Sequence, residues 1–509
     1  MNPTVITLLQ QGQRAHQEGR LAAAEQAYTQ VLQIDAHQFD AIHLLGVIAQ
    51  QRGDYETAMN FYGKALKRDR RHAGLFANLG VCLLQLQQPT EALEALEQAI
   101  SLDPRSVLAY IIRGKVLRSL KRYQLAIQSF ETAMELQIDA IDAYYERGLC
   151  LQELALHQDA LLDFEDGLHF AKRTNLTLGR FHFARGFSLQ AMHQWDDAIQ
   201  SYHAAIDDPA TQLKALFNLS LLEASQGHLE QALIWVERAQ LVDSQFMRGH
   251  LQRGHLLRQM NRFDEAVFAY QEAAACGLPL DQLDFLLASL GRHESPHMAP
   301  IEYVRELFDQ YADHFDHHLS HQLDYQLPAL LGRLFKQYLR QSCSHILDLG
   351  CGTGLCGAQL RNYTQNLVGV DVSANMLEKA AHREVYDQLH CADILAFLAA
   401  QTEQQNSFDA ILLADVLVYF GELRQVLAAC QHQLRSGALL FFTVELDQPS
   451  TTASLGYRLQ GNQRYAHQEH YVHDIAMQQQ WEVIEMHPHA LRREGKEMLT
   501  SLVCVWRKA

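Results

Sequence analysis

The sequence lacks the features that would make it fibrous, disordered or membrane-spanning. It has only 10 prolines and 28 glycines in 509 residues, with 48% hydrophobic and 20% charged residues, so collagen-like structure and wholesale disorder are excluded. No stretch approaches the roughly 18 consecutive apolar residues of a membrane-spanning helix. The first ten residues have no basic segment before an apolar one, unlike a signal peptide. We therefore expect a soluble, cytoplasmic protein of roughly three to four domain equivalents.

Positive charge and paired cysteines are also scarce. The 42 Lys and Arg residues face 59 Asp and Glu residues, which gives a formal net charge of -17. Neutralising a phosphate surface requires a basic excess, so neither nucleic acid nor a membrane is expected as a partner. The nine cysteines include no Cys-x-x-Cys pair. This pattern predicts reduced thiols rather than a disulfide framework or a structural zinc site.

What the sequence does contain is an internal period in its first 280 residues. Small residues recur every 34 positions, with a four-residue insertion near 173–176, at Gly12, Gly46, Gly80, Gly114, Gly148, Gly186, Ser220 and Gly254. An alanine follows each of them after twelve positions and a larger apolar residue after sixteen, as in Ala126 and Phe130. The spacing predicts a helical hairpin in each unit, whose small residues let the two helices approach closely. Gly19, Gly53 and Gly227 stand at the expected turns, where a left-handed conformation would suit them.

This pattern resembles the tetratricopeptide repeat family over eight units. The resemblance implies an all-α solenoid whose concave face, lined by the first helix of each hairpin, binds a protein or peptide. The side chains expected in that groove are polar and mixed in charge: Asn78, Lys115, Glu146, Asn218 and Gln252. Each of them could equally be a solvated polar position. The mixture predicts no single charge for the ligand.

A break in the pattern divides the chain. We expect a repeat array at 1–290 that ends in a short capping helix at 283–290. Two prolines mark a linker at 291–300, and a second domain follows at 301–509. Tyr303, Leu307, Tyr311 and Phe315 then recur four positions apart, which predicts an amphipathic helix.

Four histidines in the same segment have the spacing of helical metal ligands. His314 with His318, and His317 with His321, are each four residues apart. No carboxylate or cysteine signature completes either pair. We therefore expect a solvated helix surface here and no metal site.

From residue 344 onward, short apolar segments alternate with helical ones. Strands are expected at 345–349, 367–370, 389–391, 408–414 and 437–444, and helices at 355–363, 374–383, 394–400 and 423–434. This alternation predicts an α/β domain with a parallel sheet covered on both faces, whose ligand lies at the carboxyl ends of the strands. The acidic and glycine residues at those ends are Asp348, Gly350, Gly352, Gly354, Asp371 and Asp393.

These residues indicate an adenosine pocket. A glycine turn lets the backbone approach a ligand closely, Asp371 could accept both ribose hydroxyls, and Asp393 could accept the adenine amino group. The glycines at 352, 354 and 357 also satisfy the dinucleotide fingerprint, so NAD is the alternative ligand. Asp348 would repel a pyrophosphate but attract the ammonium of a methionine moiety. It therefore favours S-adenosylmethionine.

Three segments, 346–354, 369–373 and 392–394, resemble the first three motifs of class I S-adenosylmethionine-dependent methyltransferases. The resemblance covers roughly 300–509, and 415–420 is similar to the segment that passes beneath the methyl donor. It implies a Rossmann-like domain whose mostly parallel sheet ends in an antiparallel hairpin, here 481–486 with 499–506. The cofactor contacts that it adds are Val372, Met376, Ile394 and Asp415.

More narrowly, 307–316 joined to the repeats resembles a bacterial group of predicted repeat-containing methyltransferases. This resemblance implies that the helix around Tyr311 caps the cofactor pocket. It does not specify the methyl acceptor.

Methyl transfer from a sulfonium depends on alignment and exclusion of water, and oxygen or carbon nucleophiles often also need a base. The candidate catalytic residues are Asp415, Tyr419 and His467. Their structural alternatives are a loop ligand, a core residue and a surface residue, respectively. The segment 447–471 is long for a loop and is expected to form a lid or substrate wall. Candidate ligands for an acceptor carboxylate or phosphate, or else ordinary surface residues, are Arg458, Arg464 and Arg492.

Three functions stay open at this point. The preferred one is methyl transfer to an acceptor that the repeats recruit, either a protein or a carrier-bound small molecule. The second is methylation of a free small metabolite, with the repeats used for assembly. The third is a non-catalytic interaction scaffold whose nucleotide-binding fold senses the cofactor.

Overall fold

The computed structural model describes residues 2–172, 178–312, 315–317, 319, 325–339, 343–401, 408–447, 455–494 and 497–509. The chain forms two compact units, Met1–Ser244 and Gln245–Ala509. The linker expected at 291–300 lies inside the second unit, which also contains the eighth repeat. The insertion near 173–176 lies outside the described residues.

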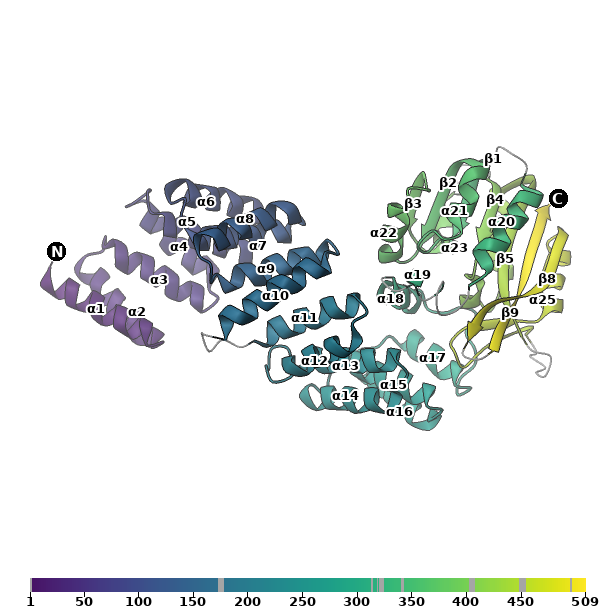
Figure 1. Cartoon of the computed structure of the whole chain (residues 1–509), viewed down its shortest axis with the longest axis horizontal. Coiled ribbons are helices and arrows are strands. Elements are labelled where there is room, and N and C mark those ends of the chain that lie inside the picture. The colour runs from purple at the N-terminus through teal and green to yellow at the C-terminus, as the bar shows by residue number, and fades with distance from the viewer. Residues whose placement is uncertain are drawn as a thin grey trace. The chain divides into compact units, whose positions relative to one another are not determined.

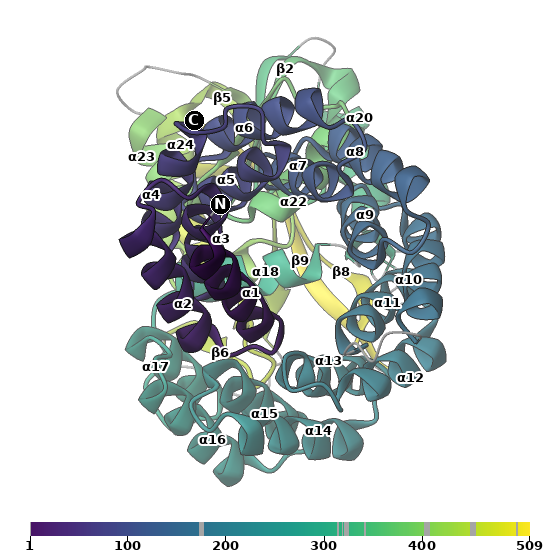
Figure 2. The ribbon, with the colours of Figure 1, turned by 90° about the vertical axis from the view of Figure 1, so that its left-hand side faces the viewer.

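The first unit is a stack of seven helical hairpins, and Figure 2 shows them following one another in chain order. The helices, in pairs, are α1 (Pro3–Gln17) and α2 (Leu21–Ile34), α3 (Phe39–Gln51) and α4 (Tyr55–Leu66), α5 (Ala73–Gln85) and α6 (Pro89–Leu102), α7 (Val107–Ser119) and α8 (Tyr123–Leu136), α9 (Ile141–Glu153) and α10 (His157–Ala171), α11 (Gly179–Ala191) and α12 (Trp195–Ala205), and α13 (Gln212–Ser225) and α14 (Leu229–Val242).

The residues that recur with the 34-residue period pack the two helices of each hairpin against each other. The eight alanines of the pattern and the eight larger residues that follow them, such as Ala126 and Phe130, are all 0% exposed. A Cβ atom added to Gly114 would lie 2.4 Å from Cε1 of Phe130, and one added to Gly46 would lie 2.5 Å from Cε1 of Tyr62. These glycines therefore make room for the ring of the second helix, which confirms the helical-hairpin prediction.

The turn between the two helices is the same in all eight repeats. Gly19, Gly53 and Gly227 have φ values of 73°, 78° and 83°, as expected. The equivalent residues of the other repeats also have positive φ, between 57° and 59°: Gln87, Lys121, Ala155, His193 and Asn261. A side chain in this conformation costs roughly 1 to 2 kcal/mol, so the packing of each hairpin outweighs that cost in five repeats.

Several residues expected in the groove bind other side chains of the array. Nζ of Lys115 lies 3.4 Å from Oε1 of Glu146, which is only 8% exposed. Nδ2 of Asn78 lies 3.1 Å from Nε2 of His43, and Asn218 lies beside the hydroxyl of Tyr202. These side chains contribute to the stability of the array as well as to its surface.

The second unit begins with helices. They are α15 (Met247–Gln259) and α16 (Phe263–Ala275) of the last repeat, then α17 (Leu280–Ser289), α18 (Ile301–Tyr311), α19 (Phe315–His317) and α20 (Leu327–Tyr338). The expected capping helix is α17, and the expected amphipathic helix is α18. No pattern in the sequence analysis indicated α20. Among the described residues, no helix combines the length and apolar character needed to cross a bilayer.

In the described part of this unit, nine strands form one central sheet (Figure 1). Its strands are β1 (Cys343–Leu349), β2 (Thr364–Asp371), β3 (Gln388–Cys391), β4 (Phe408–Leu413), β5 (Leu434–Leu446), β6 (Tyr457–Leu459), β7 (Tyr465–His467), β8 (Trp481–Glu494) and β9 (Glu497–Lys508). Strands β3, β2, β1, β4 and β5 are parallel neighbours in that order. The antiparallel hairpin β8–β9 pairs with β5 through β9. The prediction of a mostly parallel sheet with a terminal antiparallel hairpin is confirmed.

Both faces of the sheet are buried because successive strand residues enter different cores. Leu347 and Leu349 belong to one hydrophobic cluster, whereas Ile346 belongs to another. The remaining elements around the sheet are α21 (Gly357–Leu360), η2 (Arg361–Tyr363), α22 (Ala374–His382), α23 (Ile394–Gln401), η4 (Leu417–Tyr419), α24 (Arg424–Gln433) and α25 (Glu469–Gln478). Phe285 and Ala288 of α17 share the core of Leu347. The capping helix of the repeats is thus part of the sheet domain.

Two expected elements differ from the structure. The helix predicted at 355–363 is a single α-helical turn, α21, followed by the 3-10 turn η2. The described part of the expected lid, 455–471, folds as the hairpin β6–β7 and the start of α25. The first and third side chains of β6 and all three of β7 are buried, including Tyr457 at 5% exposure and Tyr465 at 0%. Because β7 pairs with β5, the hairpin is a two-stranded extension of the sheet.

Candidate functional site

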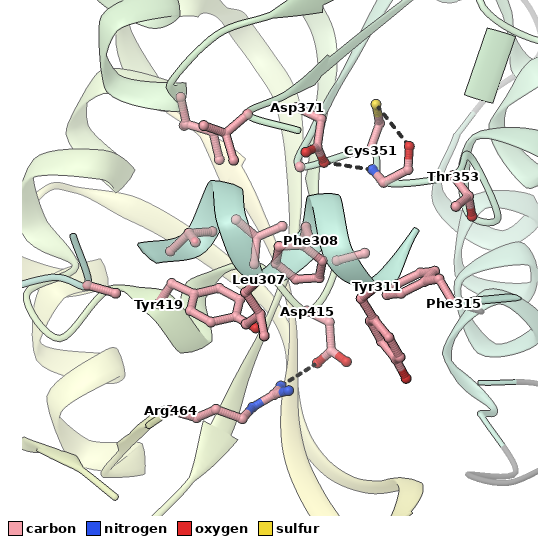
Figure 3. A pocket seen from close by; sticks show the side chains of 18 of the residues that line it. Leu307, Phe308, Tyr311, Phe315, Cys351, Thr353, Asp371, Asp415, Tyr419 and Arg464 are labelled. Atoms are coloured by element: carbon pink, nitrogen blue, oxygen red, sulfur yellow. Dashed lines mark hydrogen bonds and ion pairs between the residues drawn. The ribbon is translucent and has the colours of Figure 1, made fainter. Parts of the chain in front are cut away.

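A cavity of about 460 Å³ lies at the carboxyl ends of β1, β2 and β4. The loop that follows β1 and the ends of β2 and β4 form one side of it, and α18 lines another. Figure 3 shows Asp371 and Cys351 on one side of the view and Asp415 with Arg464 on the opposite side. We call these the glycine-loop end and the arginine end of the cavity.

The glycine loop has a left-handed backbone at three positions. Gly350, Gly352 and Gly354 have φ values of 70°, 54° and 86°. A Cβ atom on Gly350 would lie 2.3 Å from Cγ2 of Val416, whereas one on Gly352 would have, among the described residues, only Phe315 Cε1 within 4 Å, at 3.9 Å. Gly350 and Gly352 line the cavity, but Gly354 does not, because its Cβ position faces Tyr386 and Arg383. The backbone at Gly352 is therefore open to a ligand.

Asp371 ends β2 and is held rigidly beside this loop. The backbone amide of Gly352 donates to its Oδ2 at 2.9 Å, and the amide of Ser373 donates to its Oδ1 at 2.9 Å. Burial raises the pKa of Asp371, while these backbone hydrogen bonds oppose that rise. Asp371 and the adjacent Val372 both line the cavity. The carboxylate is thus held at the glycine-loop end of the cavity, and its binding of ribose hydroxyls stays a prediction.

Asp348 lies in β1 at the same end of the cavity. It is 1% exposed, and its Oδ2 accepts a hydrogen bond of 2.7 Å from the hydroxyl of Tyr386. Burial raises the pKa of Asp348 to about 7, although the Tyr386 hydrogen bond lowers it. A buried carboxylate of this kind gains stability when a cation binds beside it.

The third expected acid, Asp393, lies at the start of α23. Its Oδ1 accepts a hydrogen bond of 2.8 Å from the amide of Ala396, so it caps that helix while also lining the cavity. Ile394 lines the cavity as well. Met376 does not, because its side chain is 0% exposed within α22. The structure thus brings the three acids together and separates Met376 from them.

Helix α18 is anchored to the loop that follows β2. The hydroxyl of Ser373 donates to Oδ1 of Asp309 at 2.6 Å, and Nδ2 of Asn375 donates to the Asp309 carbonyl at 3.0 Å. The apolar face of α18, which includes Phe308 and Tyr311, lines the cavity, although none of its residues is fully buried. This helix therefore presents apolar side chains to the cavity, while its Tyr303 and Val304 pack against the core of the sheet domain.

The next segment binds the glycine loop in the same way. Asp316 of α19 accepts hydrogen bonds from the hydroxyl of Thr353 and from Arg383. Nε of Arg383 also donates to the Thr353 carbonyl at 2.6 Å. Elements α18 and α19 thus hold both loops that border the glycine-loop end.

The arginine end contains a cluster of four charged side chains. Nη1 of Arg492 donates to Oδ2 of Asp415 at 3.1 Å, and Nη2 of Arg464 lies 3.7 Å from Oδ1 of the same residue. Nε of Arg464 also donates to Oε2 of Glu445 at 3.1 Å. The negative charges of the two carboxylates thus balance the positive charges of the two guanidinium groups. The third candidate, Arg458, pairs with Asp447 at 2.7 Å and does not line the cavity.

The remaining catalytic candidates lie in different places. Tyr419 lines the cavity, its ring centroid lies 5.6 Å from that of Phe308, and burial raises the pKa of its hydroxyl. His467 is 0% exposed, hydrogen-bonds the Gly421 carbonyl at 3.1 Å and does not line the cavity. Burial lowers the pKa of His467 to about 4. Because β7 directs this side chain inward beside Tyr471, we do not retain it as a base or as a surface residue.

Some residues line the cavity although the sequence did not predict them as site residues. Phe308 and Phe315 belong to the amphipathic stripe that was recognised, so the apolar face of that helix was the available signal. Tyr325 and Asn462 have no local signal, because only the folding of distant segments brings them to the cavity. Within the described residues, no group of three potential metal ligands occurs. His314, His318, His321 and the side chain of His317 lie outside the described residues.

Comparisons with known proteins agree with this architecture. A family model described as a methyltransferase domain matches residues 347–440. Tetratricopeptide repeat models match 49–112, 183–245, 107–137 and 248–275. The chain therefore combines tetratricopeptide repeats with a methyltransferase domain.

Curated relatives match about a fifth of the chain. A protein of Geobacillus sp. (strain WCH70) named as a methyltransferase is 36% identical over 115 residues, which cover 21% of this chain and 45% of the relative. A ubiquinone biosynthesis O-methyltransferase of Coxiella burnetii is 26% identical over 115 residues, which cover 22% of this chain and 47% of the relative. The chain spans about half the length of these relatives. Among solved structures, MamA protein is 24% identical with a TM-score of 0.30, covering 35% of this chain and 98% of its own.

Proposed function

We propose that this chain transfers a methyl group from S-adenosylmethionine to an acceptor that its tetratricopeptide repeats recruit, either a protein or a carrier-bound small molecule. The observation that carries the proposal is the placement of Asp348, Asp371 and Asp393 around one cavity that an open glycine loop borders. The methyltransferase domain match over the same strands supports it.

The chemistry of the site fits this cofactor. S-adenosylmethionine carries an ammonium, a sulfonium and two ribose hydroxyls, all of which interact favourably with carboxylate oxygens. Asp348 would instead face the pyrophosphate of a dinucleotide and repel it. Among the described lining residues, the cations are Arg464 and Arg492, and both bind Asp415 at the other end. The glycine-loop end is therefore an acidic site.

The residues of this chain would act by binding, alignment and exclusion of water. S-adenosylmethionine, when bound, supplies an already activated methyl group. Asp371 would accept the ribose hydroxyls and Asp348 would pair with the ammonium, while α18 excludes water through the apolar side chains of Phe308 and Tyr311. Val372, Ile394 and Asp393 would contact the adenosine.

At the arginine end, Asp415 and Tyr419 are our candidates for contact with the acceptor. Both oxygens of Asp415 face guanidinium groups, so we assign it to holding Arg464 and Arg492 in place rather than to removing a proton. Tyr419 forms an aromatic wall with Phe308. Transfer would then depend on alignment of the acceptor against this wall.

Calorimetry with S-adenosylmethionine and the variant Asp371→Ala tests the site. We expect the variant to lose binding, with the helical content of the repeats unchanged. Asp387→Ala is the matched control, because Asp387 also binds a strand backbone but does not line the cavity. Unchanged affinity in Asp371→Ala would contradict the site assignment.

Incubation of a cell lysate with the protein and methyl-labelled cofactor tests the acceptor class. Label in protein or in carrier-bound material supports the proposal. Label in free small molecules would favour the second candidate, a metabolite acceptor, with which the ubiquinone biosynthesis O-methyltransferases among the relatives agree. Cofactor binding without any transfer would favour the interaction scaffold.

A further inference from the structure

The hairpin β6–β7 ends in a turn, residues 460–463, that forms part of the cavity wall. Asn462 of this turn and Arg464 directly after it line the arginine end. Gln463 is 5% exposed and has a φ of 68°, a conformation that a side chain other than glycine rarely adopts. Within the turn, the amide of Gln463 donates to the Gln460 carbonyl at 2.9 Å. Such a conformation persists only where the surroundings hold it in place.

The last tetratricopeptide repeat supplies part of those surroundings. Nη1 of Arg258, on α15, donates to the carbonyl oxygen of Gly461 at 2.5 Å. The hydroxyl of Tyr270, on α16, lies beside the side chains of Arg258 and Gln463, and Nδ1 of His255 lies 3.1 Å from it. The hydroxyl of Tyr303, on α18, donates to Oε1 of Gln463 at 2.8 Å. Three helices thus converge on one turn of four residues.

Arg258 occupies a repeat position that is used differently elsewhere in the array. It lies four residues after the small residue of its unit, Gly254. At the same position of two other units, glutamine accepts a hydrogen bond from the aromatic residue of its own hairpin: Tyr62 to Gln50 at 2.7 Å and Tyr202 to Gln190 at 2.8 Å. The longer, cationic side chain of Arg258 contacts its own Tyr270 and still reaches Gly461.

Helix α17 joins this repeat to the sheet domain by packing. The ring centroid of Phe285 lies 4.9 Å from that of Tyr303 and 6.3 Å from that of Tyr465 in β7. The hydroxyl of Tyr465 donates to the Pro296 carbonyl at 2.7 Å. The hairpin that carries the turn is therefore in contact with the segment that follows the last repeat.

We propose that Arg258 and Tyr270 are positioning residues: they hold the 460–463 turn so that Asn462 and Arg464 face the cavity. The last repeat would then shape the arginine end of the site, in addition to any part in recruiting an acceptor. The inference rests on the proposed function only where it identifies this cavity as the site of methyl transfer.

Hydrogen exchange measured by mass spectrometry on the full-length chain tests the proposal. Arg258→Ala should speed exchange in peptides covering 457–467 by roughly tenfold or more, because a hydrogen bond with a charged donor is lost. Arg258→Lys, which keeps a cationic donor, should restore most of the protection, and Tyr270→Phe should give a smaller increase. Arg118→Ala is the matched control, since Arg118 holds the same repeat position but pairs with Glu146.

The proposal is overturned if Arg258→Ala leaves the turn peptides unchanged, or if exchange rises equally in peptides covering 343–371. Equal effects of Arg118→Ala on the turn would overturn it as well. The S-adenosylmethionine affinity of each variant, measured in parallel, should stay within about twofold of the parent value, because the three acids lie at the other end of the cavity. Absence of binding in the parent protein would refute the proposed function and leave the exchange result intact.

Discussion

The buried carboxylate of Asp348 makes opposite contributions to stability and to cofactor binding, and the variant Asp348→Asn separates the two. Asparagine has nearly the same shape, and its side-chain oxygen can still accept the hydrogen bond that Tyr386 donates at 2.7 Å. The substitution therefore removes mainly the negative charge of the carboxylate. We expect the ligand-free variant to be more stable than the parent at pH 8 and to bind S-adenosylmethionine more weakly.

The magnitude follows from the pKa of Asp348, which burial raises from 3.8 to about 7. At about 1.4 kcal/mol per pKa unit, three units correspond to about 4 kcal/mol. Between pH 4 and pH 7 the unfolded chain loses this proton while the folded chain keeps it. The free energy of unfolding of the parent therefore falls across that window by about 4 kcal/mol and is constant above it, as far as this group is concerned. The asparagine side chain of the variant does not titrate, so the variant should lack this fall.

Urea unfolding at pH 4, 5, 6, 7 and 8 measures the stability of the sheet around Asp348, with hydrogen exchange in peptides from 343–371 as the readout. Calorimetry over the same pH values from 6 to 8 measures the binding of S-adenosylmethionine. The parent's affinity should rise with pH, because a cationic ligand favours the ionised carboxylate. The variant should lose this dependence and bind about tenfold more weakly, or worse, at pH 8.

A second carboxylate provides a control of opposite sign. Asp387 accepts a hydrogen bond of 2.7 Å from the amide of Leu367, and this bond, with the Arg361 guanidinium, lowers the pKa of Asp387. Its contribution to stability is present at neutral pH and is lost as the pH falls through the lowered pKa. Asp387→Asn should thus reduce stability at neutral pH and leave cofactor affinity unchanged. The reasoning fails if Asp348→Asn is less stable than the parent at pH 8, or if the two stability curves run parallel between pH 4 and pH 7.

Three further substitutions examine other parts of the molecule. Phe285→Ala should lower the free energy of unfolding of the sheet domain by about 3 to 5 kcal/mol, measured by the same exchange experiment, because α17 is part of its core. Ala155→Gly should stabilise the repeat array by about 1 kcal/mol in urea unfolding followed by circular dichroism, because Ala155 has a φ of 57°. Asp309→Ala removes from α18 the acceptor for the hydroxyl of Ser373 and should speed S-adenosylmethionine dissociation roughly tenfold in stopped-flow measurements. The corresponding reasoning is contradicted if Phe285→Ala is as stable as the parent, if Ala155→Gly is less stable than the parent, or if Asp309→Ala leaves S-adenosylmethionine dissociation unchanged.

The repeats could be predicted because their packing is local. Gly114 and Phe130 are sixteen residues apart in one hairpin, and the same pair of positions recurs in every unit. The turns were only partly predictable. Glycine marks three of them, whereas residues such as Ala155 adopt the same left-handed conformation because the helices on both sides are already packed.

The acids at the glycine-loop end of the cavity could be predicted from the sequence for a related reason. Asp348 and Asp371 lie at the ends of neighbouring parallel strands, and Asp348 pairs in register with Gly369. A βαβ connection brings such strand ends to one edge of the sheet, so their proximity follows from topology alone. The ionisation of Asp348 did not follow, because it depends on burial and on Tyr386, which comes from a different loop.

The number of repeats, the alternation of strands and helices, and the acids at the strand ends can all be predicted from the amino-acid sequence. Each of these depends on chain geometry that repeats at a fixed spacing. Three features depend instead on how distant segments pack: His467 is buried away from the cavity, α17 enters the core of the sheet domain, and Arg258 contacts Gly461, 203 residues further along the chain. Contacts between segments so far apart leave no periodic signal, because they depend on how complete elements pack against one another.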